Sequence, residues 1–282
     1  MDVRFVKTDP TGNTTILVES PVKLEDQAEI ARHLMRHDCL SAEQVGFIGP
    51  PRDPLAAIAS LRMMGGEFCG NAAMSLAAFL VWKGGREARD SEITVPIEVS
   101  GADGVTACLV RRAGDKFTGT VPMASPKSIG RLSLPLAGRE RLLASVVLPG
   151  ITHIIVPLEI FRSLDEARES ALLAAPEWRR LINGDAFGIL LYDRGNTPGA
   201  QNSITPLVHV KASDTTVWER GCGSGSAAIG AYLATLTGAS AVTPVSQPGG
   251  VITANARYEN GDVKEISITG SVRIVARGIA YI

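Results

Sequence analysis

The sequence predicts an α+β protein built from two pseudo-equivalent halves. The first observation behind this is an internal repeat, because residues 69–80 and 222–233 both open with Cys-Gly, continue with small residues and close on an aromatic residue followed by leucine. The second is that strands, a Gly-rich turn and a helix follow in a similar order on both sides of the Pro-containing stretch 122–126. The third is the length of 282 residues, which suits about two ordinary domains.

The sequence of the first half predicts strands interrupted by two helices. Alternating apolar residues predict strands at 3–7 and 14–18, joined by the turn cluster at 9–13. A helical period of apolar residues marks 24–36 as a helix, and the stretch 61–66 leads through two glycines into the first cysteine helix. Further strands are expected at 44–48, 93–99, 105–110 and 117–121.

The second half roughly repeats this order before its own cysteine helix. Its predicted elements are a helix at 164–173 and strands at 142–148, 153–156, 188–192 and 207–210. Two last strands, at 265–268 and 272–276, are expected to close the second half and return to the first. The N-terminal domain is therefore expected at 1–121, completed by 272–282, and the C-terminal domain at 122–271.

Composition narrows the class of protein and its partners. A content of 45% hydrophobic and 20% charged residues is that of a soluble globular protein, and a net charge of −1 gives no electrostatic case for nucleic acid or a membrane surface. The start of the chain lacks the apolar core of a secretory signal, and the longest apolar run, 76–82, is too short to span a bilayer. We expect a cytoplasmic protein that acts on a small molecule, and a homodimer is one option the sequence leaves open.

The four cysteines do not look like a disulfide framework or a metal site. They are scattered without CxxC or His-linked spacing, so we interpret them as reduced thiols. His33 and His37 have the spacing of a helical ligand pair but no third ligand in view, so solvated surface is the better interpretation. The expected protein needs neither a metal nor a cofactor.

The two cysteine segments carry the chemistry. Small residues after each cysteine leave the first N–H groups of the helix uncovered, so that a carboxylate can dock on them, and the same field lowers the pKa of a thiol held nearby. Cys69 and Cys222, acting from opposite sides of one bound carboxylate, would remove a proton from carbon and deliver one to the other face. Such a pair racemizes without a cofactor.

A less specific interpretation stands beside this one. A single cysteine ahead of a small-residue helix is usually a packed, inert residue. Two matching segments with glycine directly after the cysteine favour the functional interpretation. A non-catalytic module that binds amino acids is the alternative from another class, and the presence of both cysteines argues against it.

Six motifs, taken together, resemble the diaminopimelate epimerase / proline racemase superfamily over nearly the whole chain. Within that superfamily the chain is most similar to the histidine racemases that supply D-histidine to opine metallophores of the staphylopine type. The cysteine motifs are specific in combination, whereas Gly-Asn or Pro-Gly-Gly alone would mean little. The motifs are Pro10-Thr11-Gly12-Asn13, Glu43-Gln44-Val45-Gly46-Phe47, Gly66-Glu67-Phe68-Cys69-Gly70-Asn71, Thr152-His153, Trp218-Glu219-Arg220-Gly221-Cys222-Gly223-Ser224-Gly225 and Gln247-Pro248-Gly249-Gly250.

The resemblance implies two similar domains, each a curled, mostly antiparallel sheet around a central helix, with the active site in the cleft between them. Cys69 and Cys222 match the two catalytic cysteines of the family. Glu43 matches an acidic residue of the histidine racemases and is expected near the side-chain pocket. The positions that match those holding the carboxylate and amine of the substrate are Asn13, Gly70, Asn71, Gly223, Ser224 and Gly225.

Departures from diaminopimelate epimerase point to a shorter substrate. Where that enzyme has Asn-Pro-His, this chain has Ile151-Thr152-His153, and an insert ahead of the second cysteine is absent. An apolar Ile151 cannot provide the polar contact that a distal amino-acid group needs. Racemization of L-histidine to D-histidine is therefore preferred, with diaminopimelate epimerase or a proline/hydroxyproline-type racemase as the alternative.

Other residues near the motifs receive weaker assignments. His153 either tunes a catalytic thiol or is a structural strand histidine, and Glu219 either binds substrate, like Glu43, or is merely solvated. Arg220 is expected to brace the cysteine loop, and Trp218 to form a cleft wall or core. Cys39 and Cys108 lack glycine neighbours and a helix start, so we expect both to be packing residues.

Overall fold

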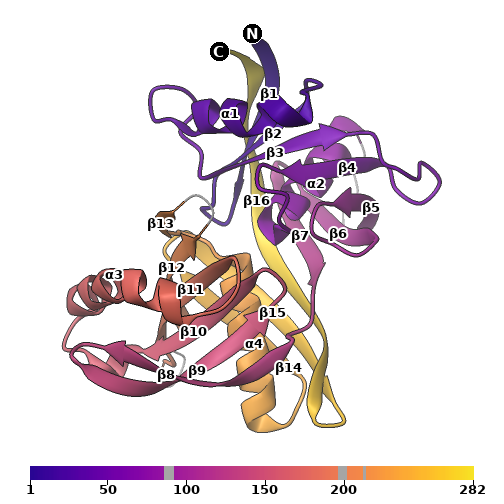
Figure 1. Cartoon of the computed structure of the whole chain (residues 1–282). Coiled ribbons are helices and arrows are strands. Elements are labelled where there is room, and N and C mark those ends of the chain that lie inside the picture. The colour runs from indigo at the N-terminus through magenta and orange to yellow at the C-terminus, as the bar shows by residue number, and fades with distance from the viewer. Residues whose placement is uncertain (86–91, 196–201, 212–213) are drawn as a thin grey trace. The chain divides into compact units, whose positions relative to one another are not determined.

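The chain forms two compact units. The computed structural model describes residues 1–85, 92–195, 202–211 and 214–282 (Figure 1). The first unit consists of Met1–Pro122 and Ile268–Ile282, and the second of Met123–Ser267. The divisions expected from the sequence fall after residues 121 and 271. Among the residues that the structure describes, no helix has both the length and the apolar character needed to cross a membrane.

The first unit is a ring of strands with a buried helix. Eight of the described strands follow one another, and the last of them, β16, pairs with both β7 and β1 and so closes the ring. The order is β1 (Asp2–Pro10), β2 (Thr15–Val18), β3 (Gln44–Gly49), β4 (Ala59–Met63), β5 (Ile93–Val99), β6 (Val105–Ala113), β7 (Lys116–Met123) and β16 (Asp262–Tyr281).

The two helices of this unit differ in how they meet the sheet. Helix α2 (Gly70–Lys83) is apolar on all sides, is buried continuously from Gly70 to Phe79, and packs against β1, β2, β5 and β6. Helix α1 (Leu24–Met35) is amphipathic and buries only one stripe, around Leu34. The more apolar helix is the one that begins at Cys69.

The second unit is a sheet covered on both faces. The strand order is β8 (Ser128–Leu136), β9 (Arg139–Leu148), β10 (Ile151–Pro157), β11 (Ala186–Asp193), β12 (Asn202–Val210), β14 (Ala241–Gln247), β15 (Gly250–Glu259) and β16, with β13 (Thr215–Trp218) paired to β12. Its helices are η1 (Leu158–Ile160), α3 (Leu164–Leu181) and α4 (Gly223–Thr237).

Strands β10 and β11 show how the two faces are divided. They are parallel and buried on both sides, and successive side chains point to opposite faces. Ile154 and Ile189 join the core beneath Trp178 of α3. Ile155 joins a separate core with Ile229 of α4. Helices α3 and α4 therefore cover opposite faces of this sheet, and α4 is the helix that begins at Cys222.

The predicted α+β class is confirmed, and several element boundaries are corrected. Helix α3 does not stop near Leu173 but continues through Pro176, because Trp178 is fully buried and its Nε1–H donates to Pro135 O at 2.8 Å. That packing offsets the hydrogen bond that a proline removes from a helix. The two last predicted strands are one strand, β16, of 20 residues.

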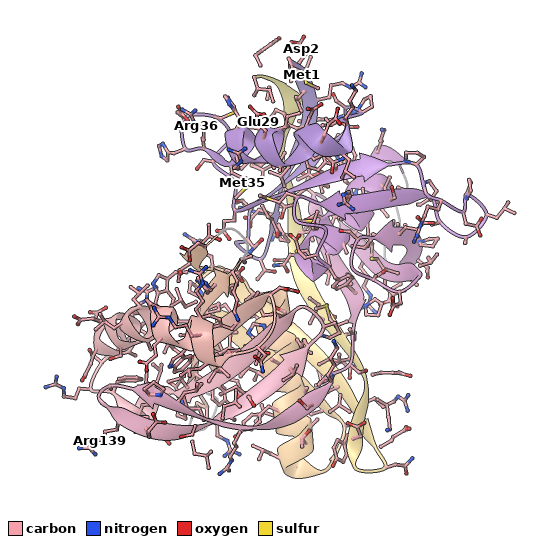
Figure 2. All side chains as sticks on the ribbon, viewed as in Figure 1. Met1, Asp2, Glu29, Met35, Arg36 and Arg139 are labelled. Atoms are coloured by element: carbon pink, nitrogen blue, oxygen red, sulfur yellow. The ribbon has the colours of Figure 1, made fainter. Side chains whose placement is uncertain are left out.

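Four strands, β8, β13, β14 and β15, have no counterpart in the prediction. Strand β8 is exposed along most of its length and alternates only at Leu132, Leu134 and Leu136, while β14 and β15 mix small and polar residues. The β8–β9 hairpin turns at Ala137 and Gly138, whose φ angles are 52° and 72°, and this pair of positive values matches the twist of antiparallel strands. Arg139 follows the turn and points away from the sheet (Figure 2).

Candidate active site

Both predicted cysteines cap the start of a helix, in the same way. Cys69 and Cys222 have extended backbones, with φ and ψ of −131° and 111° and of −107° and 106°. Cys69 Sγ accepts a hydrogen bond from the Ala72 N–H at 3.4 Å, and Cys222 Sγ accepts one from the Gly225 N–H at 3.3 Å. Ser, Thr, Asp or Asn usually stands at such a position. The N–H donor and the helix dipole at such a position each contribute in favour of the thiolate form of the sulfur.

The first turn of each helix presents N–H groups to a ligand. The Ala73 N–H donates to Cys69 O and the Ser226 N–H donates to Cys222 O, both at 3.0 Å, so the regular helical ladder begins at those residues. The N–H groups of Gly223 and Ser224 come before that ladder, where a carboxylate can be bound. Gly70 and Asn71 occupy the matching positions of α2.

Glycine at 225 is what allows the sulfur to approach its helix. A Cβ at this position would lie 3.2 Å from Cys222 Sγ and 3.0 Å from Leu190 Cδ2. Both separations are tighter than ordinary contacts between such atoms. Gly225 therefore supports the thiol by its lack of a side chain and by its N–H.

A hydrogen-bonded chain leads from Cys69 into the neighbouring strands. The Cys69 thiol donates to Gln44 Oε1 at 3.1 Å, and Gln44 Nε2 donates to Thr15 Oγ1 at 2.8 Å. Thr15 Oγ1 in turn donates to Asn13 O at 3.1 Å. The parallel pairing of β2 with β3 puts Thr15 opposite Gln44, so sheet register brings this chain together.

Asn13 and Glu43 sit at the ends of the strands that carry this chain. Asn13 is 4% exposed, and within the described residues its side-chain Oδ1 accepts no hydrogen bond. A buried amide oxygen in that state can accept an N–H of a ligand. The Glu43 N–H donates to Thr14 O at 2.9 Å, which fixes the backbone of that residue beside Asn13.

The second unit gives Cys222 an acidic neighbour. The Cys222 thiol donates a hydrogen bond to the Glu219 carboxylate. Burial raises the pKa of Cys222 well above its usual value, and the charge of Glu219 raises it further. Burial also raises the pKa of Glu219. In this arrangement Cys222 holds its proton and is a thiol at neutral pH.

His153 contacts this cysteine through a serine. His153 Nε2 lies 2.9 Å from Ser224 Oγ, and Ser224 Oγ lies 3.5 Å from Cys222 Sγ. The imidazole is 0% exposed, and burial lowers its pKa to about 3, so the ring is neutral. Its Nδ1 has no hydrogen-bond partner among the described residues, and a bare lone pair is better tolerated there than an N–H. Nε2–H therefore donates to Ser224, whose hydroxyl is directed to the sulfur.

Space for the imidazole comes from the facing strand. His153 on β10 pairs with Gly188 on β11, and a Cβ on Gly188 would lie 2.3 Å from Nδ1. No contact of that length is tolerated. The sequence offered no local sign of this requirement, because 35 residues separate the two positions.

The predicted residues fall in both units, and each unit adds a glutamine that hydrogen-bonds to its cysteine. Gln44 bonds the Cys69 thiol, and Gln247 Oε1 accepts the Cys222 N–H at 2.6 Å. Both lie within motifs that the sequence singled out without giving either side chain a role. Of the predicted residues, the first unit holds Asn13, Glu43, Cys69, Gly70 and Asn71, and the second holds His153, Glu219, Cys222, Gly223, Ser224 and Gly225.

Comparison with known proteins identifies the family. Residues 2–281 match the family described as "Histidine racemase CntK N-terminal domain". The chain belongs to the histidine racemase family. A histidine racemase from Fusobacterium nucleatum is 32% identical, with 99% of this chain and 97% of the relative covered. One from Staphylococcus aureus is 27% identical, with 99% and 98% covered. The protein is an amino-acid racemase and hence an isomerase.

Solved structures show that the fold of this racemase is shared more widely. A probable proline racemase from Agrobacterium radiobacter has a TM-score of 0.71 at 16% identity, covering 98% of this chain and 92% of that chain. A hydroxyproline epimerase from Agrobacterium vitis has a TM-score of 0.68, also at 16% identity, covering 99% and 92%. The predicted resemblance to histidine racemases is confirmed, and the fold is shared with a proline racemase-like and an epimerase structure.

The remaining polar residues and cysteines of the racemase lie away from this chemistry. Cys108 is fully buried and burial raises its pKa to about 12, while Cys39 packs at the edge of a core, so both are packing residues as predicted. Trp218 packs against a core of its unit under the guanidinium of Arg168. Helix α1 ends at Met35, so His37 lies beyond it. Among the described residues, no cluster of three or more His, Cys, Asp or Glu is placed to hold a metal ion.

Proposed function

We propose that the protein racemizes L-histidine and D-histidine by exchanging protons between the α-carbon and two cysteines, Cys69 and Cys222. The observation that carries the proposal is the shared geometry of these cysteines, each of which caps a helix and accepts an N–H at its sulfur. An inert packing cysteine needs neither the cap nor the glycine that follows it. The names of the relatives in Fusobacterium and Staphylococcus support histidine as the substrate.

The reaction begins with the carboxylate of the substrate on the N–H groups at the helix starts. One cysteine, as thiolate, takes the α-proton: the Cα–H bond breaks, an S–H bond forms, and the electron pair moves into the carboxylate. That group then carries additional negative charge, which the N–H donors stabilise as it develops. The donors around Gly223 and Ser224 already point from the helix start, so they need little reorganisation.

The second cysteine, as thiol, completes the exchange on the opposite face. Its S–H bond breaks, a new Cα–H bond forms with inverted configuration, and the electron pair returns from the carboxylate to carbon. The roles are reversed for the other enantiomer, so the two sulfurs titrate as a pair. Cys222 starts as the thiol when it donates to Glu219, and Ser224 stabilises the thiolate that remains after it gives up its proton.

The polar residues beside Cys69 and Cys222 bind the substrate in this proposal. We assign the α-ammonium to carboxylate and amide groups, with Glu219 in the second unit and Asn13 in the first. Glu43 is assigned to the imidazole of histidine, from which it accepts an N–H. A protein with this activity supplies D-histidine for the synthesis of opine metallophores, and the cytoplasm is where we place it.

The deciding test is a panel of single L-amino acids incubated with the protein and separated by chiral chromatography. Histidine is expected to give the D-enantiomer at the highest rate. In deuterium oxide, the product is expected to carry deuterium at Cα, because the incoming proton comes from a thiol that exchanges with solvent. A protein that binds histidine without incorporating deuterium would be a binding module. A higher rate with diaminopimelate or proline than with histidine would show that histidine is not the preferred substrate.

A further inference from the structure

The turn between β14 and β15 carries the motif Gln247-Pro248-Gly249-Gly250, to which the proposed chemistry gives no role. We propose that Gln247 is a positioning residue, which holds the backbone of Cys222 so that its sulfur meets the α-carbon. This inference rests on the proposed function, in which Cys222 exchanges a proton with the substrate. It adds a residue that touches neither substrate nor sulfur.

The side chain of Gln247 holds Cys222 from two directions. Its Oε1 accepts the Cys222 N–H at 2.6 Å, and its Nε2 donates to Ser226 Oγ at 2.8 Å. Ser226 Oγ then donates to Cys222 O at 2.9 Å. Both polar groups of the cysteine backbone are thus tied, directly or through one serine, to a single side chain from another strand.

The backbone of the same turn holds the loop just before the cysteine. The Gly249 N–H donates to Arg220 O at 2.7 Å. Residues 220 and 222 are therefore both anchored to the β14–β15 turn, one by main chain and one by side chain. The Glu219 carboxylate, which accepts the Cys222 thiol, precedes these anchors in the same loop. The turn acts as a clamp on the loop that carries both groups.

The clamp has two consequences for the reaction. First, the Cys222 N–H donates to Gln247 and is therefore not available to the substrate. The carboxylate of the substrate is bound by the N–H groups of Gly223 and Ser224 instead. Second, the extended φ and ψ of Cys222 are held, and these angles direct Sγ along the helix start. Proton transfer to carbon tolerates little displacement, and an error of about 1 Å can cost on the order of a hundredfold in rate.

The main variant is Gln247→Leu, which keeps the size of the side chain and removes all of its hydrogen bonds to Cys222 and Ser226. The matched control is Gln27→Leu, because the Gln27 side chain also donates to a backbone oxygen, Val22 O at 3.3 Å, but lies on α1. We expect Gln247→Leu to lower kcat about tenfold to a hundredfold, with KM for histidine changed by less than about threefold. Gln27→Leu is expected to keep the wild-type values.

Conservative variants separate positioning from general stability. Gln247→Glu keeps an acceptor for the Cys222 N–H, so its kcat is expected to lie above that of Gln247→Leu. The side chain of Gln247→Asn is one methylene too short to reach, so its kcat is expected to be as low as that of Gln247→Leu. Melting temperatures of all variants are measured alongside. A Gln247→Leu protein with wild-type kcat would overturn the proposal. So would a rise in KM at unchanged kcat, or an equal loss in the Gln27→Leu control.

Alkylation of Cys222 gives a readout that does not depend on the activity. Cys222 is 3% exposed, so iodoacetamide reaches it slowly while the loop is held. Peptide mapping of the folded protein is expected to show Cys222 alkylated at least about threefold faster in Gln247→Leu, with Cys108 unchanged as the internal reference. Unchanged alkylation at Cys222 would contradict the clamp. If the wild type racemizes no amino acid, the proposed function fails, while this measurement still decides the role of Gln247.

Discussion

The sites around Cys69 and Cys222 share a helix cap but differ in what surrounds it. In both, the sulfur accepts the N–H three residues ahead, and a glutamine 25 residues away in sequence hydrogen-bonds to the cysteine. At Cys69, the glutamine Gln44 accepts a hydrogen bond from the thiol itself. At Cys222, the glutamine Gln247 accepts the backbone N–H, and the thiol donates its hydrogen bond to Glu219.

In the proposed mechanism, two cysteines with different neighbours carry out a symmetric reaction. L- and D-enantiomers have equal free energies in water, so kcat/KM must be the same in the two directions whatever surrounds each cysteine. The two values of kcat, and the two of KM, are free to differ. In the proposed mechanism the repeated cap supplies the two sulfurs, while their different neighbours decide which cysteine is the thiol before substrate binds.

The largest expected effect comes from removing either sulfur. Cys69→Ser and Cys222→Ser are each expected to lower racemization by at least about a thousandfold, because a serine hydroxyl is far too weak an acid to serve as the base. Chiral chromatography measures the loss. A single variant retaining one-sided exchange of the α-proton in deuterium oxide would agree with the mechanism, while full turnover by either one in both directions would exclude it.

Glu43→Ala tests whether the first unit reads the side chain of the substrate. A site built around a polar contact rejects substrates that lack the partner, so histidine activity is expected to fall by at least about tenfold more than activity on any amino acid turned over without an imidazole. Rates on histidine and on the next best amino acid, for wild type and variant, give the ratio. An equal loss on both substrates would show that Glu43 stabilises the protein and does not bind the side chain of the substrate.

Ser224→Ala tests the hydroxyl that reaches Cys222. Loss of a donor to the thiolate raises the pKa of Cys222 further above its usual value, so more base is needed to form the thiolate. The kcat of the direction that uses Cys222 as the base is expected to fall about tenfold at neutral pH and to recover as pH rises. The pH profile of kcat in both directions measures this. The control is Ser240→Ala, which removes a surface serine on another turn; an unshifted profile in Ser224→Ala would contradict the role.

Gly188→Ala tests the space behind His153. The added Cβ would lie 2.3 Å from Nδ1, so the imidazole or strand must move, at a cost of about 1–3 kcal/mol in the free energy of unfolding. Gly130→Ala is the matched control, since it also lies on a strand and nothing is within 4 Å of its Cβ. Chemical denaturation compares the two. Equal free energies of unfolding for both variants would show that the imidazole site accommodates a Cβ at residue 188 without strain.

The smallest effect is expected from a chelator. The proposed proton transfers use only cysteine thiols, so dialysis against a chelator is expected to leave racemization unchanged. Loss of activity that a divalent metal restores would contradict the two-thiol mechanism. Thiol alkylation of Cys69 or Cys222, in contrast, is expected to inactivate, and bound substrate to protect.

The differences between the predicted and the observed fold at α3 and β8 have different causes. The predicted helix ends at residue 173, and the contact that carries α3 past Pro176 comes from Pro135, a distant residue. Strand β8 lies at the edge of its sheet, and its apolar alternation covers only Leu132, Leu134 and Leu136, which is a weak strand pattern. Its partner is the next strand, β9, so here the sequence pattern and not the distance of the partner limits the prediction.

The two cysteine caps follow from the amino-acid sequence, since a cap needs only a cysteine, the glycine after it and an N–H three residues on. The family follows from it too, through motifs that are each local. Which groups reach those sulfurs depends on how the strands and helices pack. His153 fits because β10 and β11 pair in a register that puts Gly188 opposite it, and Gln247 arrives from a turn beyond α4. Sheet register and helix packing fix such contacts, because they depend on burying apolar surface across the whole unit rather than on any neighbouring residue.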